Sequence, residues 1–124
     1  MNGIYPLHLL DHYKRPRCWG ALDTPDFVSE VKHPSCGDKI QLCGTVADGR
    51  VSAVAFRGSG CIISQAAASL LMELCVGKSI EEILAISDER MQELVGIALG
   101  PVRLKCVLLS RDALVGALAK IFKS

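Results

Sequence analysis

The sequence predicts an α+β chain, because its strand patterns and its helix patterns occupy separate segments. Residues 27–57 contain three runs that alternate with the period of two typical of strands. From residue 61 onward, apolar residues recur at helical spacing, and a shorter helical pattern precedes the strands. The chain has 124 residues, half of them hydrophobic. It therefore fits one domain, residues 1–124, with a sizeable core.

The composition argues against several classes of function. No apolar run approaches the roughly eighteen residues of a membrane span, and the N-terminal residues lack the pattern of a secretory signal. A net charge of +1 without a basic block leaves no footprint for nucleic acid. We therefore expect a soluble cytoplasmic protein that binds neither membranes nor nucleic acid. Its six cysteines would stay reduced, free to bind metal or do chemistry.

The N-terminal residues predict a short helix within 4–13 that lies on the body of the domain. Its apolar face would be Ile4, Leu7, Leu10 and Tyr13, and Pro6 limits where the helix can begin. A polar loop follows. It contains Cys18, which we interpret as a bystander because nothing around it has metal-ligand spacing.

Residues 39–46 and 50–57 predict two strands joined by Asp48-Gly49, and 27–31 a third. Asp-Gly between two alternating runs is typical of a hairpin with a two-residue type I′ turn. Such a turn fixes the register, with Ala47 opposite Arg50.

Extending this register along the hairpin predicts a site. It sets Asp38 opposite Ser59 and Cys36 opposite Cys61, at a separation from which two thiolates could share a metal. Alternation also places Asp38 on the same side as Cys36.

Cys61 is predicted to stand at the start of a helix, directly after the strand 50–57. Helix N-termini favour anions, and the glycines at 58 and 60 permit a metal or a second sulfur to approach closely. Two other cysteines are too far away. Cys75 is about 21 Å along the helix and Cys43 about 23 Å along its strand, so we assign both to packing.

The rest of the chain predicts three helices. Ser79 and Glu82 form a capping box, and Ser87 caps a second helix that continues to Leu99, before Gly100-Pro101. The last helix would span about 103–122, with an apolar face of Leu104, Val107, Leu108, Leu114, Val115, Leu118 and Phe122.

Cys106 falls in the first turns of that last helix, with Lys105 as a neighbouring positive charge that favours its thiolate. Together with Cys36, Asp38 and Cys61 it completes a set of four potential ligands, three sulfurs and one oxygen. His33 is the histidine nearest to this set, and we expect it to pack and not to bind.

Three segments of this sequence resemble the cysteine motifs of the IscU/SufU/NifU-type iron-sulfur cluster assembly scaffolds. They are Pro-Ser-Cys-Gly-Asp at 34–38, Gly-Ser-Gly-Cys at 58–61 and Arg-Leu-Lys-Cys at 103–106. Asp11-His12-Tyr13 and Tyr5 also match positions of that family. The resemblance implies a SufE/NifU-like fold. Its three-stranded antiparallel sheet would pack against about five helices on one side, with the cysteines at one tip.

The resemblance also implies a function. Cys36, Asp38, Cys61 and Cys106 would bind a transient [2Fe-2S] cluster, iron or zinc, with Asp38 as the exchangeable ligand. Cys106 would accept persulfide sulfur from a cysteine desulfurase, and the cluster would pass to recipient apo-proteins. A ferredoxin and a frataxin-like factor are further implied partners. The scaffold would be a monomer or a cluster-bridged dimer and not an enzyme in the usual sense, although a sulfurtransferase-like role fits it.

Two features depart from that family. IscU-type scaffolds usually have a histidine where this chain has Lys105, as SufU-type members do, but the insertion typical of SufU between Cys61 and Cys106 is absent. Residues 99–103 also differ from the Leu-Pro-Pro-Val-Lys signature, which argues against a dedicated Hsp70 chaperone.

Two other functions stay open. One is a zinc-bound protein that relays persulfide and builds no cluster. The other is a hydrolase with a catalytic zinc or a nucleophilic cysteine, for which the sequence offers no obvious general base.

Overall fold

The structure is a computed structural model that describes residues 5–33 and 37–123. Its elements in chain order are α1 (Leu7–Lys14), β1 (Phe27–Lys32), β2 (Lys39–Ala47), β3 (Arg50–Ser59), α2 (Ile62–Cys75), α3 (Ile80–Leu84), α4 (Asp88–Val95) and α5 (Pro101–Lys123). The three strands form one antiparallel sheet in the order β1-β2-β3. The expected α+β fold, with a three-stranded sheet and five helices, is confirmed.

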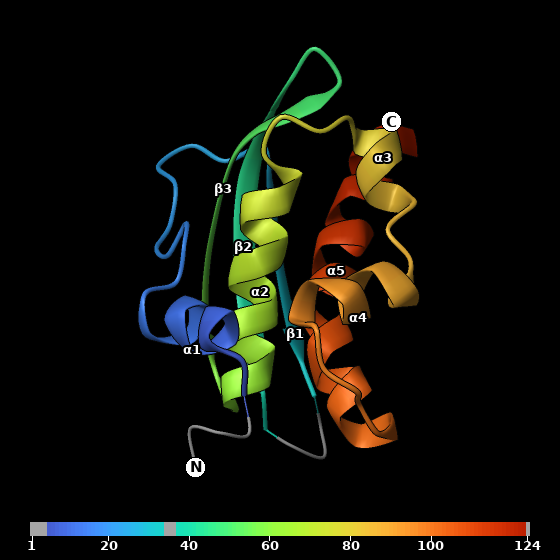
Figure 1. The fold of residues 1–124 in the computed structure, drawn as a ribbon. Coiled ribbons are helices and arrows are strands. Elements are labelled where there is room, and N and C mark those ends of the chain that lie inside the picture. Colours follow the sequence, from blue (N-terminus) through green and yellow to red (C-terminus); the bar gives the residue numbers. More distant parts are fainter. Residues whose placement is uncertain (1–4, 34–36, 124) are drawn as a thin grey trace.

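The helices form a layer on one face of the sheet (Figure 1). α2 and α5 lie against the strands and against each other, α1 packs beside α2, and α3 and α4 pack outside α5 and α2. Within the described residues, no helix combines the length and the apolar character that crossing a membrane requires.

The core lies between the sheet and the α2–α5 layer. Phe56 and Ile40 from the sheet and Leu71 and Leu114 from the helices are fully buried. Complete burial of one such side chain contributes about 1.5–3 kcal/mol. α2 is buried nearly all round, and its run of alanines, Ala66–Ala68, lets neighbouring elements approach it closely. α2 is therefore the central helix, largely buried from Ile63 onward, with its start at the surface.

The predicted hairpin is present. Asp48 and Gly49 form the turn, both with positive φ (55° and 75°), as a type I′ turn requires. Ala47 pairs with Arg50 as expected.

The register extrapolated from this turn is wrong by one residue. A bulge follows the second pair, so that Thr45 pairs with Ala53 and Ser52 is the extra residue. The Ser52 hydroxyl lies 2.7 Å from Thr45 Oγ1 and donates to the Thr45 carbonyl at 3.2 Å, which stabilises the bulge. Farther along, Lys39 and not Asp38 lies opposite Ser59. The pairing expected for Cys36 lies outside the described residues.

The predicted face of the first helix is also wrong. Leu9 and His12 of α1 are buried, whereas Leu7 is 83% exposed and Tyr13 is exposed. The His12 side chain points inward because it forms a hydrogen bond with Ser69 of α2, and this polar contact sets the rotation of the helix. The part of the prediction that rests on Ile4 lies outside the described residues.

The capping box at Ser79 and the cap at Ser87 are confirmed, but α4 ends earlier than expected. Gly96 adopts the left-handed conformation (φ 76°) and closes the helix after Val95, so Ala98 is exposed and not part of a buried face. α5 begins at Pro101, two residues before the expected start, because proline fits the first turn of a helix.

Candidate metal centre

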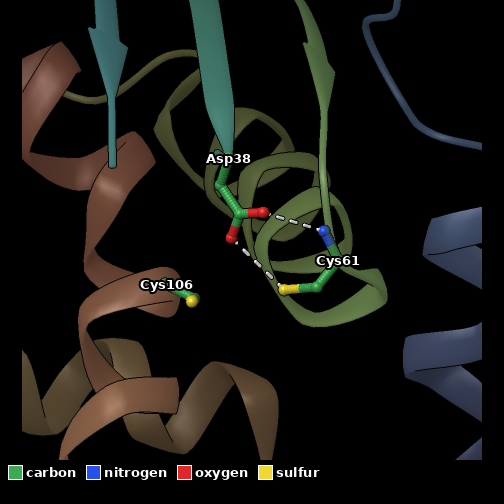
Figure 2. Close-up of side chains that lie close together, drawn as sticks. All are labelled: Asp38, Cys61 and Cys106. Carbon is green, nitrogen blue, oxygen red and sulfur yellow. Dashed lines mark hydrogen bonds between the residues drawn. The ribbon is translucent and has the colours of Figure 1, made fainter. Parts of the chain in front are cut away.

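Three of the four expected ligands come together at one end of the sheet. Asp38 directly precedes β2, Cys61 is the N-cap of α2, and Cys106 lies on α5. Their ligand atoms, one from each residue, all lie within 4.8 Å of one another. Figure 2 shows the three side chains converging on a common space from three different elements. The fourth, Cys36, lies outside the described residues.

Asp38 is positioned by Cys61. One carboxylate oxygen accepts the Cys61 backbone N–H at 3.0 Å, and the other accepts the Cys61 thiol at 3.4 Å (Figure 2). The Asp38 side chain is buried. A carboxylate buried beside a helix start gains from the unpaired N–H groups and the positive end of the helix dipole.

Gly60 makes this arrangement possible. Its φ of 131° favours glycine, and a Cβ at this position would overlap the Asp38 carboxylate and come within 2.9 Å of Asp38 Cα. The register shift explains this contact, because it brings Asp38 level with Gly60 and not with Ser59. Gly60 is thus a site residue that the sequence indicated only as permitting close approach.

The two described thiols differ in access. Cys61 is exposed, whereas Cys106 is only 4% exposed and lies in the second turn of α5, two residues farther from the helix start than expected. The helix dipole therefore acts more directly on Cys61 than on Cys106. Both line a cavity of about 420 Å³, to which Tyr5 and Arg103 also contribute.

Tyr5 and Arg103 close one side of this cavity. The Arg103 guanidinium lies over the Tyr5 ring, 6.0 Å from its centroid, which is cation–π distance. Lys105 is exposed on α5 beside Cys106.

The donor set suits a soft metal. Two thiols and one carboxylate around an open cavity match the ligands of zinc and of iron-sulfur clusters, which take cysteine sulfur first and tolerate oxygen. The residues on either side of 34–36 lie next to this site, because the His33 backbone N–H donates to the Asp38 carbonyl at 2.7 Å. His33 is not part of the group of ligand atoms found among the described residues.

The remaining cysteines lie elsewhere, as expected. Cys75 and Cys43 are buried and Cys18 is half-buried. Burial raises the pKa of the Cys75 thiol to about 12, with nearby Cys18 adding to the effect. Burial, and then the Glu73 carboxylate, raise the pKa of Cys18. The raised pKa makes the Cys75 and Cys18 thiols poor nucleophiles and poor metal ligands.

His12 forms a polar clamp that the sequence interpretation did not find. Its Nδ1 lies 2.7 Å from the Ser69 hydroxyl, which also accepts the Arg17 backbone N–H at 2.8 Å. Burial lowers the His12 pKa and so favours the neutral ring, whose Nδ1 accepts the Ser69 hydroxyl when the ring proton is on Nε2. The sequence does contain a signal for this inward position. His12 follows Leu9 by three residues, so both lie on one helical face. Ser69 is fully buried, so this pair has a structural role and offers no nucleophile to substrate.

Comparisons with known proteins agree with the fold. Residues 4–124 match the family described as NifU-like N-terminal domain. The chain is 37% identical to the iron-sulfur cluster assembly scaffold protein IscU of Haemophilus influenzae, covering 93% of each chain. It is 34% identical to the zinc-dependent sulfurtransferase SufU of Bacillus subtilis, covering 97% of this chain and 92% of that one.

A solved structure shows the same architecture. The crystal structure of a putative iron-sulfur cluster assembly scaffold protein for the SUF system from Fervidobacterium islandicum superposes with a TM-score of 0.81 at 28% identity, covering 94% of this chain and 98% of the other. The fold is therefore that of the iron-sulfur scaffold class. The chain belongs to the family of NifU-like N-terminal domains.

The alignments also bear on the mixed subtype. The alignment with SufU runs over 137 residues, more than this chain contains, so SufU has residues that this chain lacks. The alignment with IscU of Haemophilus influenzae runs over 119 residues, but the alignment with IscU of Streptococcus pyogenes also runs over 137. Alignment length therefore does not assign the chain to one of the two names.

Proposed function

We propose that this protein is a scaffold on which [2Fe-2S] clusters assemble before transfer to apo-proteins. The observation that carries the proposal is the convergence of Asp38, Cys61 and Cys106 within 4.8 Å at one open tip of the fold. Cys36 joins them as the fourth ligand. It is two residues from Asp38 along the chain, and the backbone on either side of 34–36 lies at the site.

The mixed ligand set fits a cluster that must leave. Thiolates hold iron strongly, whereas a carboxylate oxygen is the weaker partner for soft iron-sulfur chemistry. Asp38 reaches the site from a strand end, and its carboxylate bonds to the N–H and the thiol of Cys61. It can therefore exchange between iron and the start of α2, which provides a step for release.

Cys106 is the acceptor of sulfur in this proposal. Its thiolate attacks the outer sulfur of a cysteine persulfide on the desulfurase. The S–S bond of the donor breaks, and the donor cysteine leaves as a thiolate. Conversion of each transferred sulfur to sulfide then takes two electrons, which a ferredoxin-type donor supplies. Lys105 is the exposed residue that precedes the acceptor on α5.

A zinc-bound persulfide relay is the second candidate. Lys105 before Cys106 favours it, and so does the likeness to a protein named a zinc-dependent sulfurtransferase. In that case the ligand set would hold one zinc ion and the site would pass sulfur without building a cluster.

The hydrolase alternative has less support. His8 bonds to the Leu94 carbonyl and His12 to Ser69, so both are engaged in the packing of α1. His33 is the remaining histidine, and the described ligand group does not include it. No histidine is therefore arranged as a general base in the ligand group among the described residues.

Anaerobic reconstitution tests the proposal. Protein freed of metal is incubated with ferrous iron and sulfide, and the absorption spectrum is followed before and after adding apo-ferredoxin. A scaffold gives a [2Fe-2S] spectrum that moves to the ferredoxin. A relay retains zinc and gives no stable cluster. Cys36→Ser, Cys61→Ser and Cys106→Ser should each abolish the cluster, and the half-buried Cys18→Ser should not. A full cluster in any of the first three would refute the ligand set.

A further inference from the structure

A second groove adjoins the thiol site. It has a volume of about 550 Å³ and lies between the loop after α1, the end of β3 and the start of α2. Tyr13, Pro16 and Trp19 form one wall, and Gly60 lines both this groove and the cavity that holds Cys61. Trp19 is 51% exposed although it packs edge-on against Phe56. The groove is thus an aromatic-walled surface that leads to the thiols.

The outer edge of β3 already pairs with one short segment. The Phe56 N–H donates to the Cys18 carbonyl and the Gly20 N–H donates to the Phe56 carbonyl, both at 2.9 Å. This makes a parallel bridge between Trp19 and Phe56. The segment then turns away, while β3 continues to Ser59.

The edge beyond Phe56 is open at Gly58. In an antiparallel pair, backbone groups alternate between facing the partner strand and facing away from it. Those of Phe56 face away from β2, so those of Gly58, two residues on, do so as well. Among the described residues no chain segment pairs with β3 at Gly58. The Gly58 N–H and carbonyl therefore face the groove.

The floor of the groove adds a polar side chain. Gln65 of α2 is only 6% exposed, yet it lines the groove beside Gly58. A backbone edge, a buried amide and exposed aromatic rings are the groups that recognise an extended peptide, which pairs through its main chain and packs its side chains on the rings.

We propose that this groove binds an extended segment of the protein that delivers sulfur, as a short added strand on β3 at Gly58. Gly58 is three residues from Cys61, about 10 Å along an extended chain, so a segment of three or four residues reaches the thiols. A sulfur donor presents one reactive sulfur on a single extended segment, and this groove has room and backbone groups for one such segment. A cluster recipient must bring several ligands at once. The identity of the partner rests on the proposed function, but the binding of an extended peptide does not.

Disulfide tethering to metal-free, reduced protein tests the groove without any cluster or sulfur transfer. The probes are the tetrapeptides acetyl-Thr-Val-Thr-Cys-amide and acetyl-Cys-Thr-Val-Thr-amide, each supplied as its mixed disulfide with 2-mercaptoethanol. The Cys61 thiolate attacks the peptide sulfur and releases 2-mercaptoethanol. Intact-mass spectrometry gives the concentration of 2-mercaptoethanol that reverses half of the tethering, and peptide mapping identifies the residue.

Backbone N-methylation provides the matched control, because it removes the main-chain donors and keeps the side chains. We expect one of the two peptides to need about five- to tenfold more 2-mercaptoethanol for release than its N-methylated form, as loss of the peptide N–H that donates to the Gly58 carbonyl would give. Equal release of methylated and unmethylated forms of both peptides would overturn the proposal.

Variants locate the effect. Trp19→Ala and Tyr13→Ala should each reduce the difference between the methylated and unmethylated forms. Val28→Ala, which changes a 70% exposed residue on β1, should leave it unchanged. An undiminished difference in both aromatic variants would overturn the assignment to this groove. So would a metal-free dimer that Trp19→Ala dissociates, because the occupant would then be a second copy of this chain.

Discussion

The tip of the fold and the packed region around α1 and α2 each hold cysteines, but in opposite surroundings. At the tip, Cys61 is exposed and its backbone and thiol both bond to Asp38. In the packed region, Cys75 is fully buried and Cys18 half-buried, and burial raises the pKa of both thiols. Cys61 therefore has the polar, open surroundings that thiolate chemistry requires, and buried Cys106 lines the same cavity.

The same contrast holds for the polar side chains. Asp38 at the tip is buried against a helix start with an open cavity beside it, so its bonds can be exchanged for a metal. Ser69 and His12 are buried within helix packing and satisfy each other. One polar group is placed for exchange and the other for rigidity, so burial alone does not mark a functional residue.

The largest expected effect is on thiol reactivity. At pH 8 a thiol with a pKa of about 12 is ionised to about one part in 10⁴, so Cys75 should resist iodoacetamide in the native metal-free protein, whereas exposed Cys61 reacts readily. Peptide mapping after timed alkylation measures both rates. Comparable rates for Cys61 and Cys75 would abolish the distinction between the two regions.

Gly60→Ala should weaken zinc binding by about 10- to 100-fold, because the added Cβ displaces the carboxylate of Asp38 and, through it, the start of α2. A competition titration with a chelator measures the affinity. Gly116→Ala is the matched control, since Gly116 is exposed on α5 and a Cβ there meets no atom within 4 Å. Unchanged zinc affinity in Gly60→Ala would show that Asp38 is not held as described.

Asp38→Ala should slow cluster release several-fold if the carboxylate is the exchangeable ligand. The three thiolates remain, and the arm that an incoming ligand displaces is gone. Asp38→Asn retains an acceptor for the Cys61 N–H and separates loss of ligation from loss of this bond. Cluster decay and transfer to apo-ferredoxin are measured side by side. Faster decay with undiminished transfer would exclude Asp38 as an exit step.

The smallest expected effect is the pH dependence of the clamp in the packed region. The His12 pKa is lowered in the fold, first by burial and then by Arg17, while Glu73 and Asp11 oppose this and His8 adds a small lowering. The unfolded chain therefore binds the proton more readily, and the free energy of unfolding should fall as the pH drops below about 6.5. Denaturant titrations between pH 7 and 5 measure it. His12→Gln should flatten the dependence and His8→Gln should not.

Local rules predicted much of the fold. Asp48-Gly49 defined the hairpin, Ser79 and Ser87 the caps, and Gly60-Cys61 the start of α2, because turn and cap chemistry depends on a few adjacent residues. Part of the candidate site followed from such signals, since Asp38 and Cys61 stand at element ends. The convergence of Cys106 with the others rested on the family resemblance and on assumed helix convergence.

Contacts between distant segments account for the errors. The bulge at Ser52 is held by Thr45 from the opposite strand, so the alternation of either strand alone does not show it. The rotation of α1 depends on a hydrogen bond from His12 to a residue 57 positions away. Gly96 ends α4, but the periodic apolar pattern continues past this glycine and so predicted a longer helix.

The central claim is that Cys36, Asp38, Cys61 and Cys106 form one metal site, and zinc K-edge X-ray absorption on the zinc-loaded protein tests it directly. The account predicts three sulfurs at about 2.3 Å and one oxygen at about 2.0 Å from the zinc. Asp38→Ala should remove or replace the oxygen and keep the three sulfurs. A first shell of nitrogen and oxygen alone, or a shell that Asp38→Ala leaves unchanged with its protein oxygen still present, would contradict the account.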